Sequence, residues 1–163
     1  MLFYIYFFVD GCQVFASSGS AMQRTKTLHQ KIEEWLARKR GEDVFLTREF
    51  ADLNGERQVL RTLHDLVENG KLIRMGYGVY ARAIISRLSG EPLLYSPNDL
   101  ASAARQALDK LGVEWEPTEW ECAYNEQRST QVPARPTLKV KDRFSRRLSD
   151  GHTELLIERQ SHA

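Results

Sequence analysis

The chain lacks the features that mark several protein classes. It has two cysteines among 163 residues, and these two, Cys12 and Cys122, do not have the spacing of metal ligands. No apolar run reaches the roughly 20 residues that a membrane-spanning helix needs. The net charge of +1 gives no sign of a nucleic-acid partner, so only local charge can do so. These absences predict a soluble, cytoplasmic protein without a metal, a cofactor or a membrane partner.

Basic residues are also missing from the start of the chain. The first nine residues, MLFYIYFFV, are apolar or aromatic, and no lysine or arginine precedes Arg24, whereas a secretory signal needs a basic region. Small residues between Phe15 and Ala21 loosely fit a cleavage site, so a signal peptide stays as the alternative. Because regular periodicity begins after Met22, we expect residues 1–21 to be an extension upstream of the natural start. N-terminal sequencing of the native protein should then begin at Met22 or Gln23.

Helical and strand-like periodicities alternate up to residue 82. The predicted elements are a helix at Thr25–Arg40, a strand at Val44–Leu46, a short helix at Arg48–Leu53, a helix at Glu56–Asn69, and strands at Lys71–Arg74 and Val79–Arg82. A Gly-x-Gly turn joins the last two strands into a hairpin. This order is that of a winged helix-turn-helix, in which the second helix enters the major groove of DNA and the hairpin forms the wing.

The remaining sequence predicts a second, smaller region. Pro92 and Pro97 mark a linker, and a helix follows at Asp99–Leu111. Later strands are predicted at Thr137–Val140, Phe144–Leu148 and Thr153–Glu158, with a turn at Asp150–Gly151. The predicted fold is therefore α+β: an extension at residues 1–21, a winged helix-turn-helix at residues 22–90, and a helix-plus-antiparallel-sheet domain at residues 91–163.

The exposed face of the helix at Glu56–Asn69 is the candidate reader of base edges, because arginine and glutamine form the best hydrogen bonds to them. Its candidate residues are Arg57, Gln58, Arg61 and Thr62. The candidate wing and phosphate contacts are Lys71, Arg74, Gly76, Tyr77 and Gly78. We expect the first group to give sequence preference and the second to give affinity. Residues 22–82 hold 12 basic and 9 acidic residues, so an ordinary solvated helix face remains the alternative.

Charge is also uneven in the second region. Residues 114–126 include five acidic and no basic residues, which could dock a basic partner or simply face water. A basic block follows, and it could extend the DNA footprint, bind RNA or form a solvated sheet face. Its candidate residues are Arg135, Lys139, Lys141, Arg143, Arg146 and Arg147. Of the two nearby tryptophans, Trp115 and Trp120, we expect either that both are in the core or that one is at a partner surface.

Catalytic patterns are missing. The four histidines have no recognisable catalytic spacing to a cysteine or carboxylate, and there is no phosphate loop, H-E-x-x-H or G-x-S-x-G motif. We therefore expect a protein that is not an enzyme.

The stretch Arg48–Ala81, REFADLNGERQVLRTLHDLVENGKLIRMGYGVYA, resembles the N-terminal domain of AbiEi-type antitoxins, with its V-x-x-x-L-x-x-L-x-x-x-G helix and G-x-G-V-Y-A strand. Ser129–Ala134, STQVPA, and the later L-L-I-E-R are similar to the short relatives of that family. The resemblance covers Thr25–Arg159. It implies an autoregulator that binds operator DNA, represses its own operon and antagonises a nucleotidyltransferase-like toxin, with homodimer formation an open expectation.

One departure from the family and two alternatives accompany this resemblance. Full-length antitoxins have a larger C-terminal domain than this chain, which puts toxin neutralisation in doubt. The alternatives are a stand-alone winged-helix regulator and a protein-interaction module that uses the winged fold without DNA. If the two activities separate along the chain, a fragment ending near Gly90 should bind DNA, and one starting near Tyr95 should neutralise the toxin.

Overall fold

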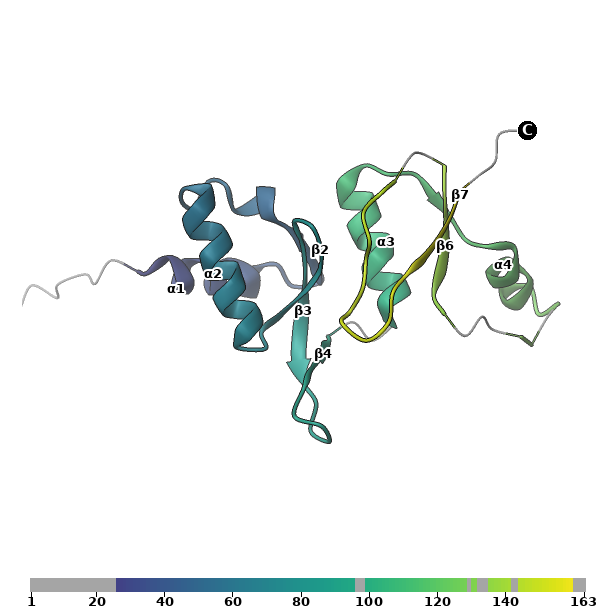
Figure 1. Ribbon diagram of the computed structural model, residues 1–163, viewed down its shortest axis with the longest axis horizontal. Helices are drawn as coiled ribbons and strands as arrows, with labels where there is room; N and C mark the ends of the chain where they lie inside the picture. The colour runs from purple at the N-terminus through teal and green to yellow at the C-terminus, as the bar shows by residue number, and fades with distance from the viewer. Residues whose placement is uncertain (1–25, 96–98, 129, 132–134, 142–143, 160–163) are drawn as a thin grey trace, which may run out of the picture.

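The computed structural model describes residues 26–95, 99–128, 130–131, 135–141 and 144–159. Its elements, in chain order, are α1 (Leu28–Arg38), β1 (Val44–Leu46), the 3-10 helix η1 (Thr47–Phe50), α2 (Glu56–Glu68), β2 (Leu72–Gly76), β3 (Val79–Ile85), β4 (Pro92–Leu94), α3 (Asp99–Leu111), β5 (Trp115–Glu116), α4 (Glu119–Asn125), β6 (Thr137–Val140) and β7 (Leu156–Arg159). The fold is α+β, as predicted (Figure 1).

Local signals explain the helices that were predicted. The Thr27 hydroxyl accepts a hydrogen bond from the Gln30 amide at 3.3 Å, and the Gln30 side chain accepts one from the Thr27 amide at 3.1 Å. This capping box begins α1. Gly70 follows the C-cap residue of α2 and has a φ of +67°, the left-handed conformation in which helices commonly end. The predicted short helix at Arg48–Leu53 is instead the 3-10 helix η1 followed by a turn. The Ala51 and Leu53 amides donate to the carbonyl groups three residues earlier, Arg48 and Phe50, at 3.3 and 3.0 Å.

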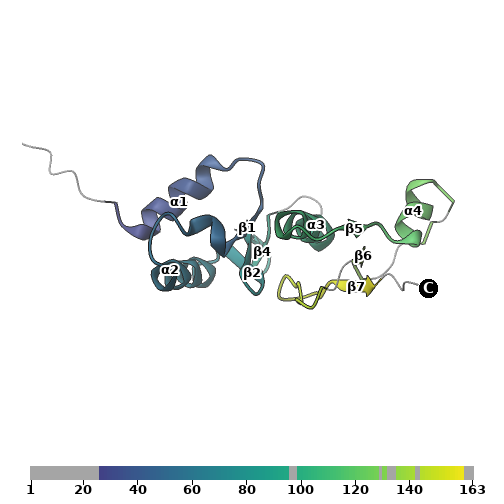
Figure 2. The ribbon, with the colours of Figure 1, turned by 90° about the horizontal axis from the view of Figure 1, so that it is seen from above.

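The first sheet has the order β1-β3-β2, and β4 pairs with the far end of β3. All pairings are antiparallel, with Phe45 opposite Tyr80. Helices α1 and α2 lie on one side of this sheet and α3 on the other (Figure 2). Phe45 and Tyr80 therefore belong to the core under α1 and α2, whereas Val44 and Leu46 belong to the core under α3. Because both faces are covered, every residue of β1 is buried.

The core under α3 crosses the predicted boundary at residue 90. Its members from the first region are Val44, Leu46, Met75, Val79 and Ala81. Its members from the second region are Leu100, Ala103, Ala104, Ala107, Leu108, Leu138, Val140, Phe144, Leu148 and Leu155. The stretch predicted to be a linker also supplies β4, which is hydrogen-bonded to β3. The two predicted domains thus share one core and one sheet, so the apolar core does not divide where the sequence suggested.

The second sheet corrects the predicted antiparallel arrangement. Strands β5 and β6 are antiparallel, but β6 and β7 are parallel, with Leu138 opposite Ile157. A parallel pair needs a long crossover, and the segment between β6 and β7 supplies it. The predicted strand at Phe144–Leu148 is therefore part of a connection. The Asp150–Gly151 turn is confirmed, since the Asp150 carboxylate accepts hydrogen bonds from the His152 and Thr153 amides at 2.9 and 2.6 Å.

Helix α4 was not predicted. Its start is capped by Thr118, whose hydroxyl accepts a hydrogen bond from the Glu121 amide at 3.4 Å. Two acidic residues, Glu119 and Glu121, lie in its first turn, where their negative charges stabilise the helix by interacting with the positive end of its dipole. The glutamates on either side of Trp120 are therefore helix-start signals.

An ion-pair cluster joins the two sides of the predicted boundary. The Lys110 ammonium of α3 lies 2.7 Å from a Glu42 carboxylate oxygen and 2.9 Å from one of Glu49. Arg48 donates a hydrogen bond to the Lys110 carbonyl oxygen. The hydrogen bond from Lys110, and then that from Lys39, lowers the pKa of the Glu42 carboxyl. The end of α3 is thus fastened electrostatically to the segment around β1 and η1.

Acid should weaken this cluster. Because folding lowers the pKa of Glu42 below its ordinary value of 4.5, the cluster contributes stability above that pH and loses it as the pH falls through the lowered pKa. We expect the midpoint of thermal unfolding to fall less steeply with acid in Glu42→Gln than in the native chain, by a small amount because Glu42 is partly exposed. Circular dichroism melts from about pH 6 to pH 3 measure this. The exposed Glu68→Gln serves as the control, and identical slopes for all three proteins would contradict the expectation.

Among the described residues, no helix is long and apolar enough to cross a membrane. Several sequence predictions concern residues outside the described part of the chain: the extension at residues 1–21 with its start at Met22, Pro97, Arg143 and most of Ser129–Ala134. Those predictions stay as they were.

Candidate nucleic-acid interface

The first turns of α2 form an exposed polar face. Arg57 and Arg61 lie one turn apart and are exposed, while Val59 and Leu63 are buried against the sheet. Gln58 is also exposed, and its side-chain oxygen accepts a hydrogen bond from the Asn54 amide nitrogen at 2.6 Å. This contact leaves the Gln58 amide group as a donor. The structure thus brings together three of the four predicted base-reading residues.

Thr62 does not belong to this face. Its exposed fraction is 8%, and its hydroxyl donates a hydrogen bond to the Gln58 carbonyl at 3.0 Å. The reason is its position in the helix: Thr62 is three residues after Val59 and four before Leu66, which places it in the buried stripe. The prediction that Thr62 reads base edges was therefore wrong.

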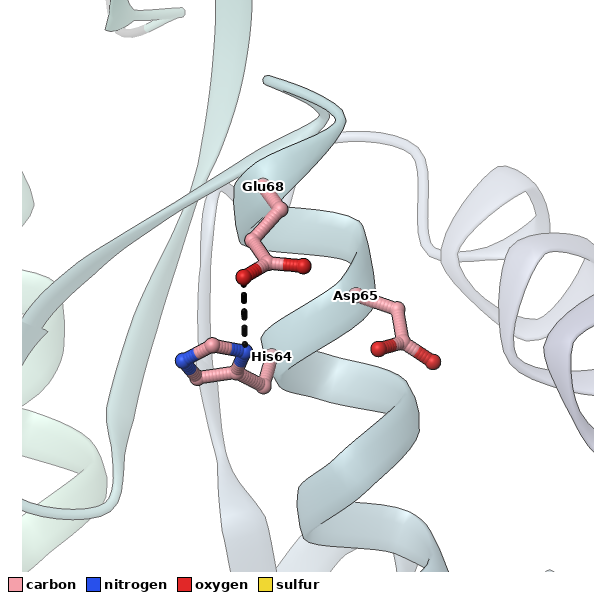
Figure 3. A group of neighbouring side chains, drawn as sticks. All are labelled: His64, Asp65 and Glu68. Carbon is pink, nitrogen blue, oxygen red and sulfur yellow. Dashed lines mark ion pairs between the residues drawn. The ribbon is translucent and has the colours of Figure 1, made fainter.

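The C-terminal half of α2 carries acidic groups and one histidine. The His64 imidazole lies 3.5 Å from the Glu68 carboxylate, and Figure 3 shows Asp65 pointing to another side of the helix. The nearest ligand atoms of the three side chains lie within 4.8 Å of one another. The side chains of His64 and Glu68 are exposed, and no other described element completes a metal site around them. The carboxylates of Asp65 and Glu68 would repel phosphate. The two arginines of α2 lie on its first turns, where Glu56 is the acidic residue.

The hairpin of β2 and β3 ends beside the start of α2. At its tip, Tyr77 is 77% exposed and Gly78 has φ of +69°, a conformation that favours glycine. The Gly78 carbonyl accepts a hydrogen bond from the Thr47 amide at 3.0 Å, which fixes the tip relative to η1. Arg74 is exposed and stands opposite Tyr80, so its side chain lies on the sheet face that carries α2.

A groove of about 490 Å³ separates the start of α2 from the hairpin tip. Asn54, Gly55 and Glu56 border it on the α2 side, Tyr77 and Gly78 border it on the hairpin side, and Arg146 also lines it. Gly55 has no side chain to cap the helix, so the first backbone amides of α2 remain available to an anionic group. This arrangement can receive one strand of a polyanion between helix and hairpin.

Lys71 lies away from this groove. It precedes β2 and forms an ion pair with Glu33 of α1, about 16 Å along the strand from the Gly76 end at 3.3 Å per residue. The hydrogen bond from Lys71 lowers the pKa of the Glu33 carboxyl. The structure therefore corrects the prediction that Lys71 contacts phosphate beside the wing, because its charge is used to join α1 to the sheet.

The basic block of the second region is divided by the fold. Lys141 lies 3.1 Å from Glu116 and 3.3 Å from Glu114, and these hydrogen-bonded carboxylates raise the pKa of Lys141. Lys139 stands between Glu116 and Glu158 in the second sheet. These two lysines therefore face the acidic block, and the exposed Arg135 precedes the same strand. Only Arg146 and Arg147 of the described block lie beside the hairpin tip.

The two tryptophans of the acidic block differ. Trp115 packs against the shared core, and its indole nitrogen donates a hydrogen bond to Asp109 at 2.8 Å. Trp120 on α4 is 57% exposed. One tryptophan thus lies at the surface, although a partner for it stays a prediction. Part of the acidic rim is already paired, since Glu121 forms an ion pair with Arg105 and two more glutamates bind Lys141.

No protein-family model, no curated protein and no solved structure matches this chain. The resemblance to AbiEi-type antitoxins therefore stays a prediction, and the interface is defined by its geometry alone. Sequence reasoning found Arg57, Arg61 and the glycine-flanked tip from local patterns. It missed the groove and the contact of Arg146 with Tyr77 beside it, because Arg146 and Tyr77 are far apart in the chain and no local pattern links them.

Proposed function

We propose that this chain is a non-enzymatic, double-stranded-DNA-binding regulator in which α1 to β3 form a winged helix-turn-helix. In this proposal α2 is the recognition helix and the β2–β3 hairpin is the wing. The observation that carries it is the pair of exposed arginines, Arg57 and Arg61, on the first turns of α2. The start of that helix borders the same groove as the hairpin tip, and the two arginines lie outside the groove lining. A helix enters the major groove with its N-terminal residues against the bases, and the acidic end of α2 would stay outside.

Chemistry assigns a role to each side chain. Arg57 and Arg61 can bind guanine through two hydrogen bonds, and the free amide group of Gln58 can donate to a base edge. Arg74 on the wing lies where a phosphate of the flanking backbone would pass, and the glycines of the tip let the backbone approach it. The uncapped start of α2 supplies amide donors for another phosphate.

Duplex DNA binding with a strong dependence on salt tests the proposal. The slope of log affinity against log salt should be about −0.9 for each phosphate that the chain neutralises, and Arg74 supplies one of these contacts. Filter binding to the duplex upstream of the chain's own gene, across a salt series, measures the slope. Retention on a heparin or DNA column at low salt separates DNA binding from a protein-interaction module with the same fold. Absence of binding at low salt would rule out the proposal.

An antitoxin-type role is the more specific form of this proposal, with repression of its own operon in the cytoplasm and antagonism of a nucleotidyltransferase-like toxin. Its supports are the family resemblance of Arg48–Ala81 and the exposed aromatic side chains of Trp120 and Tyr124 on α4. Co-expression of the intact chain with a neighbouring toxin tests it, since failure to rescue growth would leave a stand-alone regulator.

We also propose a homodimer, because the protruding hairpin between β3 and β4 exposes Ile85 and Leu88 (Figure 1). Light scattering tests this proposal by measuring the mass of the particle in solution.

A further inference from the structure

The connection between β6 and β7 runs along the β2–β3 hairpin. We call its residues Phe144–Ser149 the strap. The Ser149 amide donates a hydrogen bond to the Met75 carbonyl at 2.9 Å. The Arg146 guanidinium donates one to the Tyr77 carbonyl at 3.3 Å and lies 5.9 Å from the centre of the Tyr77 ring. The strap is therefore bonded to the hairpin at Met75, close to the tip, and at Tyr77 in the tip itself.

The contact between strap and hairpin depends on a glycine. A Cβ atom at Gly76 would lie 2.6 Å from the Arg147 carbonyl oxygen and 3.2 Å from a methyl group of Leu148. The first distance is too short for any real Cβ atom, so a larger residue would force the two backbones apart. Phe144 and Leu148 are buried in the shared core. The position of the strap is thus fixed by two kinds of contact. Phe144 and Leu148 pack in the shared core, and the Arg147 backbone lies close to the Gly76 backbone.

This fixed position concentrates positive charge around the tip. Arg74, Tyr77, Arg146 and Arg147 border a hollow of about 550 Å³. Arg146 also lines the groove beside the start of α2. The Arg147 side chain is 88% exposed, and its ion pair with Glu154 has a separation of 3.6 Å. An exposed ion pair of this kind contributes little to stability. Arg147 can therefore leave the Glu154 carboxylate and bind a phosphate at low energetic cost.

We propose that the strap is a second phosphate-binding element beside the wing, and that Arg146 and Arg147 bind the backbone of the same duplex whose bases α2 reads. The inference rests on the proposed function. Arg146 is already held in place by the Tyr77 carbonyl and ring, so less side-chain entropy is lost on binding. Its remaining N–H groups are free to bind phosphate oxygens in the geometry that guanidinium favours. The C-terminal region would then be part of the DNA-binding surface.

The test removes the two strap charges from the full chain. Arg146→Ala/Arg147→Ala should reduce the magnitude of the salt slope by about 1.8, or about 0.9 for each lost phosphate contact. At low salt it should weaken binding roughly tenfold or more, because two phosphate contacts are lost. Fluorescence anisotropy with the same duplex as above measures both. Arg135→Ala/Lys139→Ala removes the same charge from the second sheet and should leave the slope nearly unchanged.

Two further variants separate position from charge. Arg146→Lys/Arg147→Lys keeps both charges and should restore most of the slope. Gly76→Ala changes no charge but displaces the strap, and it should weaken binding while circular dichroism shows a folded chain. An unchanged slope in the double alanine variant, or an equal loss in the Arg135/Lys139 control, would overturn the inference while leaving DNA binding by α2 intact. No binding by the native chain would overturn both.

Discussion

A chain that ends at Gly90 should fail to fold stably. The truncation would remove α3 and the second sheet and would uncover one whole face of the first sheet. The large side chains left without cover are Val44, Leu46, Met75 and Val79. Burying a side chain of this size contributes about 1.5–3 kcal/mol, so their exposure costs on the order of 6 kcal/mol or more. That cost is comparable to the entire stability of a small domain, about 5–15 kcal/mol.

Circular dichroism and urea unfolding of the 1–90 fragment beside the full chain measure this effect. We expect the fragment to lack a cooperative transition and the full chain to show one. Leu138→Ala in the full chain is the matched point variant, because Leu138 is fully buried in the shared core on the far side of the boundary. It should lower the free energy of unfolding by about 2–5 kcal/mol without splitting the transition. A folded fragment that binds DNA as well as the full chain would restore the division that the sequence suggested.

The sequence predicted the elements whose signals are local. Helices α1, α2 and α3 have apolar residues at helical spacing and end at capping residues or glycines, and the β2–β3 hairpin has its glycine-flanked turn. What it did not predict depends on contacts between distant segments. The parallel pairing of β7 and the partners that meet in the shared core are of this kind. A signal for the shared core was nevertheless present: Val44–Leu46 and Val79–Ala81 are each continuously apolar or aromatic, as in strands covered on both faces.

The candidate site shows the same limit. Arg57 and Arg61 were found because helical spacing alone places them opposite the buried stripe. Thr62 was misplaced because threonine was judged by its polarity, although its spacing from Val59 and Leu66 lies within that stripe. Lys71 was grouped with the wing because the two are close in sequence. However, β2 is extended, so it places Lys71 about 16 Å from the wing tip at 3.3 Å per residue.

Replacement of the two exposed arginines of α2 should have the largest effect on DNA binding of any change at the surface. Arg57→Ala/Arg61→Ala removes two candidate base contacts, each worth about 1–3 kcal/mol. The summed loss of about 2–6 kcal/mol corresponds to a decrease in specific affinity of roughly 30-fold or more. Because both side chains are exposed, the stability of the fold should change little. Anisotropy titrations with the specific duplex and with a random duplex of equal length measure the two affinities.

Two matched variants make this result interpretable. Thr62→Val lies on the same helix, and its hydroxyl is already bonded within that helix, so it should leave both affinities unchanged. Arg57→Lys/Arg61→Lys keeps the charge but loses the two-pronged hydrogen bonding of guanidinium, so it should retain affinity for random DNA while losing preference for the specific duplex. If the double alanine variant instead loses affinity equally for both duplexes, the arginines contact phosphate, and a different surface must read the bases. If it loses affinity for neither duplex, α2 is not the recognition helix.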